Sequence, residues 1–313
     1  MGITTESGYD YVLSPELVRQ LVLAEELPLR SREIPEPEAS IILRRGSIIG
    51  SRIERHIRVF RTMDRSRELI INREKRGESF PSGFVILADE LTGSKGRFHR
   101  TWHAPEGGLW LTIIIVDVLL APHRHLYPLV AGISCCELVR SYGVDSRIKW
   151  VNDVNVQGKK IVGILTETMI GPCSGEEYIL IGIGMNVNNE SFPSELAPMA
   201  VSLRNLLGSP VDLELLAGRL LTKFIWNIGL LLHEEERSLQ DEDMNTGSQQ
   251  LLDQWRSLSD SIGKRVFFGY DVQAKIEYEA EVIGLDHQGF LQLRHIPSGT
   301  ILTENSGEIL YLP

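Results

Sequence analysis

The segment that most constrains the fold is a charged turn between two apolar runs. Lys149-Trp150-Val151-Asn152-Asp153 follows a run that ends at Ile148, and Lys160 stands just before a second run that starts at Ile161. Two buried strands joined by a short connection fit this pattern, and they place an amide, a carboxylate and an ammonium group at one end of a sheet. Taken alone, the segment is also compatible with an ordinary charged β-turn, because Gly-Lys-Lys turns are common.

A second segment, between the apolar runs 84–88 and 109–121, combines glycines with cations. It reads Leu91-Thr92-Gly93-Ser94-Lys95-Gly96-Arg97-Phe98-His99-Arg100-Thr101-Trp102. Glycines let backbone N–H groups approach an anion, and an arginine can bind a phosphate through two parallel hydrogen bonds. The spacing is neither that of a Walker A loop nor that of a dinucleotide-binding fingerprint. By itself the segment is equally a solvated basic loop.

Together the two segments resemble the biotin protein ligase family (biotin/lipoate ligase catalytic domains). That family carries a Gly-Arg-Gly-Arg-x-x-Arg-x-Trp loop and a Lys-Trp-Pro-Asn-Asp motif followed by a lysine. The resemblance continues in the same order along the chain, over about residues 50–313. Residues 61–69 resemble a Ser-Thr-Met-Asp-x-Ala-x-Glu-Leu helix start, residues 181–188 a Gly-x-Gly-x-Asn strand, and residues 201–204 a Ser-Leu segment. The last fifty or so residues resemble a small SH3-like domain.

The resemblance implies an α+β fold: a mixed, largely antiparallel sheet packed with helices, as in class II synthetase-like catalytic domains, plus a small SH3-like β-barrel. We expect an N-terminal extension without a winged helix at 1–50, the catalytic domain at 51–262 and the C-terminal domain at 263–313. The patterns predict strands and helices in alternation, with the helices on one side of the sheet and a linker at 30–39. Strands are expected at 59–62, 84–88, 109–121, 147–151, 160–168 and 178–186, and helices at 14–25, 64–75, 126–142, 211–236 and 251–258.

The activity implied by the resemblance is ATP-dependent activation of biotin as biotinyl-5′-AMP, followed by transfer to a specific lysine of a biotin-carrier domain. In this reading Arg97 and Arg100 meet the phosphate charge, and Lys160 bridges the carboxylate and the α-phosphate. Asp153 places Mg²⁺ or orients the incoming amine. The remaining residues assigned to substrate and nucleotide binding are Arg61, Thr62, Leu91, Ser94, Lys95, Gly96, Trp102, Asn152, Gly163, Gly184 and Asn186. Residues 202–204 are expected near the adenine, and Trp102 has a core role as its alternative.

The chain departs from the family pattern where the acid would be recognised. Arg61 stands where the family has a serine, and Leu91 stands where it has a glutamine. In the loop, Ser94-Lys95-Gly96 replaces Gly-Arg-Gly and His99 replaces a glycine. Val151 replaces the proline of the second motif. Leucine removes a donor and an acceptor that would read a cyclic urea, a loss of about 1–3 kcal/mol if the partner group stays unpaired. An adenylate-forming ligase for another acid (lipoate, octanoate or an unassigned one) is therefore an alternative. A non-catalytic ligand-binding relic is a third reading, which the presence of Lys160 and Arg97 disfavours.

Composition limits the partners and the compartment. The formal net charge of −10 at pH 7 argues against a protein that coats nucleic acid. The three cysteines show no metal-ligand spacing, and a chain of this size does not need disulfides, so a reducing cytoplasm is expected. No signal peptide pattern begins the chain, and the run 109–121 is too short to span a membrane. The family resemblance also raises a homodimer through the edge of the sheet.

Overall fold

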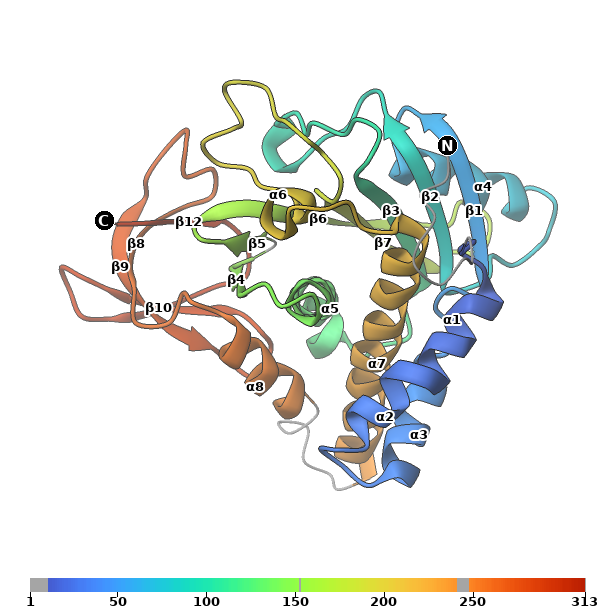
Figure 1. Ribbon diagram of the computed structural model, residues 1–313. Coiled ribbons are helices and arrows are strands. Elements are labelled where there is room, and N and C mark those ends of the chain that lie inside the picture. Colours follow the sequence, from blue (N-terminus) through green and yellow to red (C-terminus); the bar gives the residue numbers. More distant parts are fainter. Residues whose placement is uncertain (1–10, 152, 241–247, 313) are drawn as a thin grey trace.

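The computed structural model describes residues 11–151, 153–240 and 248–312. A seven-stranded sheet with the order β1-β2-β3-β7-β6-β5-β4 forms the larger part of the protein (Figure 1). Its strands are β1 Arg52–Val59, β2 Phe84–Leu91, β3 Leu109–Val116, β4 Ser146–Lys149, β5 Asp153–Val156, β6 Lys159–Ile170 and β7 Glu177–Met185. Only β1 and β2 pair in parallel; the other neighbours are antiparallel. The predicted mixed, largely antiparallel sheet is confirmed.

Helices cover both faces of this sheet, so the prediction that they lie on one side is wrong. The described helices are α1 Pro15–Leu21, α2 Leu27–Arg30, α3 Glu36–Gly46, α4 Thr62–Glu74, α5 Tyr127–Ser141, α6 Leu203–Leu207, α7 Leu213–Gln240 and α8 Gln249–Leu258. α4 packs on β2, β3 and β7 over a small core that includes Ile86 and Ile114. α5 and α7 lie over the larger core, which takes Val85 and Ile113 from the same two strands. A strand buried on both faces reads as a continuous apolar run, and 109–116 is one.

The N-terminal segment folds as helices that pack on α7, as Figure 1 shows in blue. Ser14 accepts a hydrogen bond from Leu17 N at 3.2 Å, and Pro15 is the first helical residue, so the predicted helix start is confirmed. The linker predicted at 30–39 is wrong in its second half, because α3 begins at Glu36. Its Ala39, Ile42 and Leu43 are buried against α7, and this tertiary burial outweighs the local charge and proline content.

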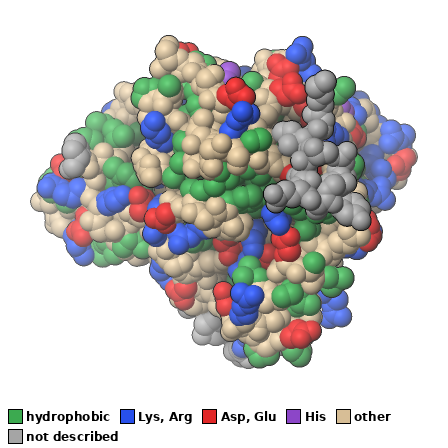
Figure 2. All heavy atoms as spheres, in the orientation of Figure 1, with side chains coloured by type: hydrophobic (Ala, Val, Ile, Leu, Met, Phe, Trp, Pro, Cys, Tyr) green, Lys and Arg blue, Asp and Glu red, His purple; other side chains and the backbone are tan. Residues whose placement is uncertain are grey.

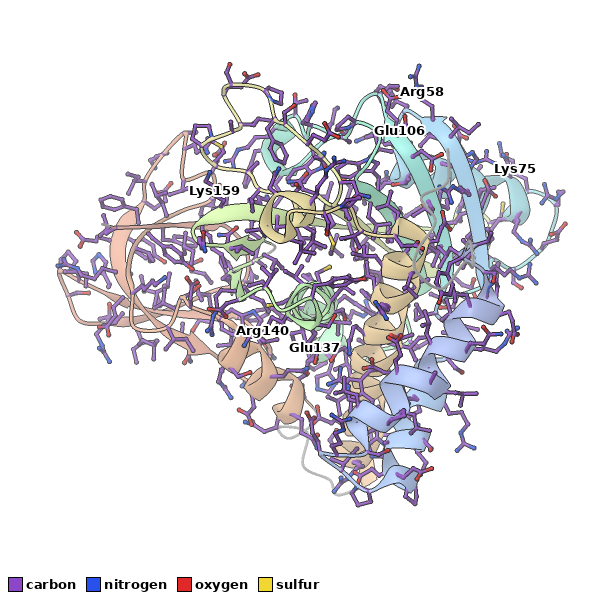
Figure 3. All side chains as sticks on the ribbon, in the orientation of Figure 1. Arg58, Lys75, Glu106, Glu137, Arg140 and Lys159 are labelled. Carbon is purple, nitrogen blue, oxygen red and sulfur yellow. The ribbon has the colours of Figure 1, made fainter. Side chains whose placement is uncertain are left out.

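The long helix α7 is the central helix of the protein. Its segment Leu213–Leu239 is long and apolar enough to cross a membrane by length and composition, but 83% of its most apolar window is buried inside the protein. It therefore packs as a core helix, between α3 and α5. Two glycines allow α3 to approach closely: a Cβ on Gly46 would lie 1.9 Å from Ile225 O, and one on Gly229 would lie 2.1 Å from Ile42 O. Side chains fill the space between this helix and the sheet (Figure 3).

A second, five-stranded antiparallel sheet follows α8. Its order is β11-β10-β9-β8-β12, and its strands are β8 Arg265–Gly269, β9 Tyr278–Leu285, β10 Leu291–His295, β11 Ile301–Glu304 and β12 Glu308–Tyr311. This C-terminal sheet, drawn in red and orange in Figure 1, is consistent with the predicted SH3-like β unit. The boundary predicted near 262 falls between α8, which ends at Leu258, and β8.

Candidate functional site

A cavity of about 540 Å³ lies where β5, β6 and β7 meet the loop of residues 92–108 and the C-terminal sheet. Apart from the segment 202–204, every described residue that the sequence predicted for the site lines this cavity, although these residues come from distant parts of the chain. They are Lys160, Arg97, Asp153, Arg100, Arg61, Thr62, Leu91, Ser94, Lys95, Gly96, Trp102, Gly163, Gly184 and Asn186. Asn152 lies outside the described residues. The structure therefore brings the predicted residues together, and their chemical roles stay predictions.

The predicted lysine and aspartate form an ion pair in the cavity. Lys160 Nζ lies 2.5 Å from Asp153 Oδ1, and it also lies 5.1 Å from the ring centroid of Trp102. Lys159, the preceding residue on β6, is exposed and donates a hydrogen bond to Ala197 O at 3.4 Å (labelled in Figure 3). Neighbouring side chains on a strand point to opposite faces, so only one lysine of the pair faces the cavity.

The connection between the two predicted strands contains a further strand, which the sequence analysis missed. β5 lies between β4 and β6 and pairs with both, so Asp153 begins a strand instead of standing in a turn. Val154 and Val156 of β5 are buried while Asn155 between them is less so. This alternation over four residues is the pattern of a half-buried strand, and it is short enough to be taken for a turn.

Glycines on neighbouring strands form the floor of the cavity under Trp102. Gly163 on β6 pairs with Gly184 on β7. A Cβ on Gly184 would lie 2.8 Å from Trp102 Nε1, and one on Gly163 would lie 3.0 Å from Trp102 Cζ3. The indole thus rests on bare backbone, and Trp102 belongs to the cavity wall.

The cationic loop is closed on itself by short-range hydrogen bonds. Ser94 Oγ donates to Trp102 O, and Gly96 N donates to Arg100 O at 2.8 Å. A β-bridge links Lys95 to Thr101. These contacts form a narrow hairpin with Arg97 and Arg100 near its tip.

Both arginines of this loop reach the C-terminal sheet. Arg97 Nη1 donates to Gly307 O at 2.7 Å. Arg100 forms an ion pair with Glu308 at 2.8 Å and a second with Asp271. Burial lowers the pKa of Arg97, while the hydrogen bond with Glu308 raises the pKa of Arg100. The two cations therefore have different surroundings, although the sequence predicted one role for both.

At the other end of the cavity, Arg61 is already paired. The strand predicted at 59–62 is wrong, because β1 ends at Val59 and α4 begins at Thr62 with Arg61 as its N-cap residue. The guanidinium of Arg61 binds both carboxylate oxygens of Asp64 at 2.6 Å. Thr62 is buried against the sheet, where its hydroxyl accepts a hydrogen bond from Thr112 Oγ1 at 2.8 Å.

Several cavity residues were missed by the sequence analysis. Lys149 lines the cavity, and burial lowers its pKa; its place at the head of the Lys-Trp-x-Asn-Asp motif was an available signal. The other wall residues that were not predicted include Asn155, Phe192, Leu196, Met199, Gln273 and Glu308. Among the described residues, Asn155 Oδ1, Asn186 Oδ1 and Trp102 Nε1 are buried without a hydrogen-bond partner. Buried polar atoms of this kind call for a polar ligand or water.

The segment 202–204, which was expected near the adenine, is not part of the cavity wall. Ser202 is the N-cap of α6, and its hydroxyl accepts from Asn205 N at 3.2 Å and donates to Asn189 O at 2.7 Å. Arg204 pairs with Glu190 at 2.8 Å. The wall at this side comes instead from residues just before, such as Met199 and Ala200.

Parts of this chain are similar in sequence to known proteins. The model of the biotin/lipoate A/B protein ligase family matches residues 60–186. The Bacillus subtilis protein called bifunctional ligase/repressor BirA is 37% identical over 145 residues, which are 44% of this chain and 44% of that protein. The Mycobacterium tuberculosis protein called biotin–[acetyl-CoA-carboxylase] ligase is 28% identical over 241 residues, covering 74% of this chain and 79% of that protein.

The fold matches solved structures over most of the chain. The biotin protein ligase from Aquifex aeolicus, in complex with biotin and ATP, has a TM-score of 0.64 at 22% identity. The match covers 83% of this chain and 98% of that chain. The matched segment of the Bacillus relatives spans less than half of their length. The similarity to the biotin/lipoate A/B protein ligase family therefore rests on residues 60–186, and the likeness to the Aquifex structure extends it as a likeness of fold.

Proposed function

We propose that the protein is an ATP-dependent ligase that activates biotin as biotinyl-5′-AMP and transfers it to a specific lysine of a biotin-carrier domain. The observation that carries this proposal is the Lys160–Asp153 pair, which lies in one cavity with Arg97 and the glycine floor. The names of the relatives, biotin–[acetyl-CoA-carboxylase] ligase among them, and the biotin and ATP in the Aquifex structure support biotin as the acid.

In the first step, a carboxylate oxygen of biotin attacks the α-phosphorus of ATP. The new O–P bond gives a mixed anhydride, the bond from the α-phosphorus to its bridging oxygen breaks, and pyrophosphate leaves with the electron pair. Two anions must approach each other, so a cation between them lowers the barrier. Lys160 provides that cation from β6, and Arg97 provides a second from the loop.

In the second step, the neutral amine of the acceptor lysine attacks the acyl carbon, and AMP leaves with the electron pair. The bond from the acyl carbon to the phosphate oxygen breaks, and the attacking nitrogen releases one proton to solvent as the amide forms. Asp153 is the carboxylate beside Lys160 that can accept a hydrogen bond from the incoming amine and orient it. Trp102 covers the glycine floor and keeps water from that side of the cavity.

The cavity also fits a Mg²⁺ ion that arrives with ATP. Mg²⁺ in nucleotide sites takes one or two protein carboxylates and otherwise phosphate and water oxygens. Asp153 is such a carboxylate, and the neighbouring Asn155 Oδ1 is buried without a partner among the described residues. When bound, the ion would neutralise phosphate charge.

A different acid is a second candidate, which the pairing of Arg61 favours. The guanidinium fork between Arg61 and Asp64, with Leu91 on the same wall, offers fewer free polar groups for a cyclic urea than a serine and a glutamine would. An acid with a less polar end, such as lipoate or octanoate, makes smaller demands there.

Acid-dependent exchange of labelled pyrophosphate into ATP tests the proposal, with biotin, lipoate and octanoate compared on the purified protein. Exchange with biotin supports the ligase proposal. Exchange with another acid alone keeps the chemistry and changes the substrate. No exchange with any of the three would contradict the biotin ligase proposal and leave an untested acid or a non-catalytic ligand-binding protein.

The double substitution Arg61→Ser and Leu91→Gln separates the two acids. If the natural substrate is not biotin, this variant should exchange better with biotin than the wild type does and worse with the natural acid. A fall in biotin-dependent exchange would show that Arg61 and Leu91 do not lie at the head-group end. Thermal unfolding of the variant provides the check on folding.

We propose no nucleic-acid partner for this chain, although the Bacillus relatives are called ligase/repressor. The formal net charge is −10. On the face that Figure 2 shows, acidic and basic side chains are interspersed. A surface that binds DNA needs a concentrated basic patch. A gel-shift experiment with the protein and random duplex DNA at low salt checks this proposal.

A further inference from the structure

We propose that Glu308 and Asp271 of the C-terminal region are positioning residues: they hold the cationic loop (residues 94–102) through Arg100, and they leave Arg97 to meet the phosphate charge. The inference rests on the proposed function for its catalytic consequence, while the contact itself is a property of the fold. It assigns different roles to two arginines that the sequence pattern treats alike.

Arg100 is fully engaged by carboxylates. Its Nη1 and Nη2 donate to the two carboxylate oxygens of Glu308, both at 2.8 Å, and Nη2 also donates to Asp271. Two parallel hydrogen bonds to one carboxylate are the strongest geometry available to an arginine. One positive charge beside two negative charges leaves a negative surplus. A phosphate that approaches Arg100 therefore meets net repulsion, and Arg100 is poorly suited to bind it.

Arg97 differs because none of the described carboxylates pairs with it directly, although Glu308, Asp153 and Asp271 lie near enough to act on its charge. Its Nη1 donates to the backbone carbonyl of Gly307 at 2.7 Å, and it forms no ion pair with any residue that the structure describes. Its side chain lines the cavity. Burial lowers the pKa of Arg97, as expected for a partly desolvated cation without a direct counter-ion. Such a cation binds an anionic ligand strongly, because the ligand supplies the missing charge.

The conformation of the loop depends on these contacts. Phe98 has φ 54° and ψ 33°, in the left-handed region that residues with a side chain rarely adopt. Its ring lies 4.9 Å from the guanidinium carbon of Arg97 and 5.3 Å from that of Arg100. A strained backbone conformation persists only where surrounding contacts determine it. The contacts from Gly307, Glu308 and Asp271 provide that support.

Glu308 and Asp271, which hold the loop, lie close together at one end of the β8–β12 strand pair. Glu308 is the first residue of β12 and pairs with Gly269, the last residue of β8, and Asp271 follows two residues later. Ile309 and Leu310 of the same strand line the cavity. The C-terminal sheet is therefore a wall of the site as well as the anchor of the loop.

The first experiment compares three variants in pyrophosphate exchange: Arg100→Ala, the double variant Asp271→Asn with Glu308→Gln, and Arg97→Ala. If Arg100 acts only through its carboxylates, the first two should lose kcat/KM for ATP equally, about 10- to 100-fold. Combining Arg100→Ala with Glu308→Gln should cost nothing further, since both changes break the same contact. Arg97→Ala should lose activity whether or not Glu308 is intact.

Two outcomes of that experiment would overturn the inference. A loss in Arg100→Ala more than about tenfold greater than in the carboxylate double variant would mean that Arg100 touches the phosphate. Higher activity of the carboxylate double variant would mean that the contact restrains the enzyme. Glu281→Gln is the matched control, because Glu281 lies on the same sheet, pairs with Arg294 at 2.8 Å and is not among the residues that line the cavity.

The second experiment needs no substrate. Trypsin cleaves after lysine and arginine, and mass spectrometry can follow cleavage after Lys95 and Arg97. The Asp271→Asn, Glu308→Gln double variant releases the loop, so trypsin should cleave these bonds faster than in the wild type. In the Glu281→Gln variant, trypsin should cleave them at the wild-type rate. Unchanged cleavage in the double variant would overturn the inference. This result stands even if no acid supports exchange, so failure of the inference and failure of the proposed function are distinguishable.

Discussion

Gly163 on β6 lies directly opposite Gly184 on β7, and the indole of Trp102 rests on both. This contact with Trp102 explains why glycines occupy paired positions on two adjacent strands, although glycine inside a strand usually weakens a sheet. Any side chain at either position would stand where the indole lies. The floor of the cavity therefore depends on the absence of two side chains.

Gly184→Ala should lower kcat/KM for ATP and acid by at least about tenfold, because displacing the wall of a site misplaces the reacting groups. The new Cβ would lie 2.8 Å from Trp102 Nε1, so the indole must move. Exchange kinetics measure the loss. Gly132→Ala is the control: a Cβ at this position of α5 would lie 3.8 Å from Ile148 of β4, an ordinary contact, and the variant should keep full activity. Full activity in Gly184→Ala would contradict this account of the floor.

Lys160→Ala should abolish adenylate formation, and Lys159→Ala should not. Lys160 pairs with Asp153 in the cavity, whereas Lys159 is exposed and only touches Ala197 O. Loss of a cation that stabilises the transition state costs about 10²–10³ in rate. Adenylate formation in a single turnover measures both variants. Equal activity of the two would remove the basis for assigning Lys160 to the chemistry.

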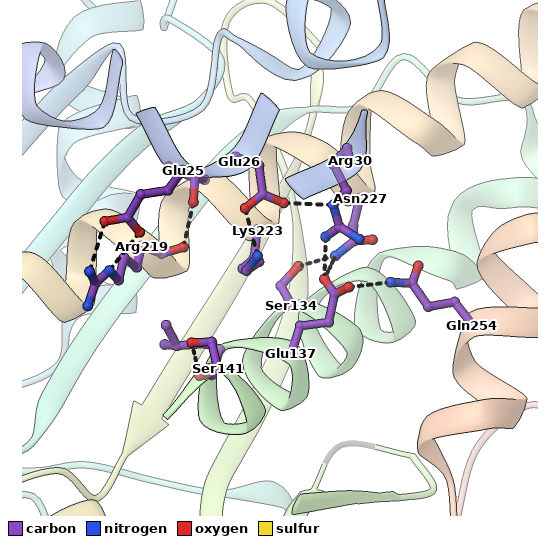
Figure 4. Close-up of polar contacts among 12 residues, drawn as sticks. Glu25, Glu26, Arg30, Ser134, Glu137, Ser141, Arg219, Lys223, Asn227 and Gln254 are labelled. Carbon is purple, nitrogen blue, oxygen red and sulfur yellow. Dashed lines mark hydrogen bonds and ion pairs between the residues drawn. The ribbon is translucent and has the colours of Figure 1, made fainter. Parts of the chain in front are cut away.

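A buried network of charges joins the N-terminal helices to α7 and α5 (Figure 4). Glu26 accepts hydrogen bonds from Arg30 at 2.8 Å and from Lys223 at 2.7 Å, and Arg30 also pairs with Glu137 at 2.8 Å. Glu137 accepts further from Asn227 and Gln254. Two cations and two carboxylates balance one another in the interior.

Glu26→Leu should lower the free energy of unfolding by about 3–5 kcal/mol, because it leaves the buried ammonium of Lys223 without its counter-ion. Urea unfolding measures the change. Glu16→Leu breaks the exposed Glu16–Arg19 pair and should leave the free energy of unfolding nearly unchanged. Similar small effects of both would mean that the N-terminal helices are not integral to the core.

Stability should depend on pH through Glu234. Burial raises the pKa of this carboxyl to about 7, against hydrogen bonds from Gln250 N and Leu251 N that act in the other direction. The pKa of Glu234 in the folded state lies above the usual 4.5. The protonated carboxyl therefore contributes its full stability to the fold below about pH 4.5, and this contribution is lost as pH rises through 7. Once ionised, the buried group costs about 3 kcal/mol.

Glu234→Gln removes that ionisation and keeps an acceptor for the N–H of Gln250. The variant should therefore gain stability relative to the wild type at pH 8 and little at pH 5. Urea unfolding at the two pH values checks this, with Glu195→Gln at an exposed position as the control. An equal difference between variant and wild type at both pH values would rule out Glu234 as the titrating group.

The local patterns of this sequence were enough to predict the types of most elements, and the family resemblance added many of the residues that line the cavity. The apolar runs became β2, β3 and β7, and Ser14 with Pro15 marked a real helix start. These signals depend on nearest neighbours along the chain, so they can be read without a structure. The family motifs added which of these elements carry the site.

Tertiary structure alone decided the remaining features. Nothing near Arg100 in the chain indicates Glu308 or Asp271, which are 208 and 171 residues away. The choice between Lys159 and Lys160 depends on which face of β6 meets the cavity, and the helical fate of 36–46 depends on burial against α7. A sequence pattern records the preference of each residue for burial or solvent. The packing of the sheets and helices decides which distant charge, which face of the sheet or which glycine each residue contacts.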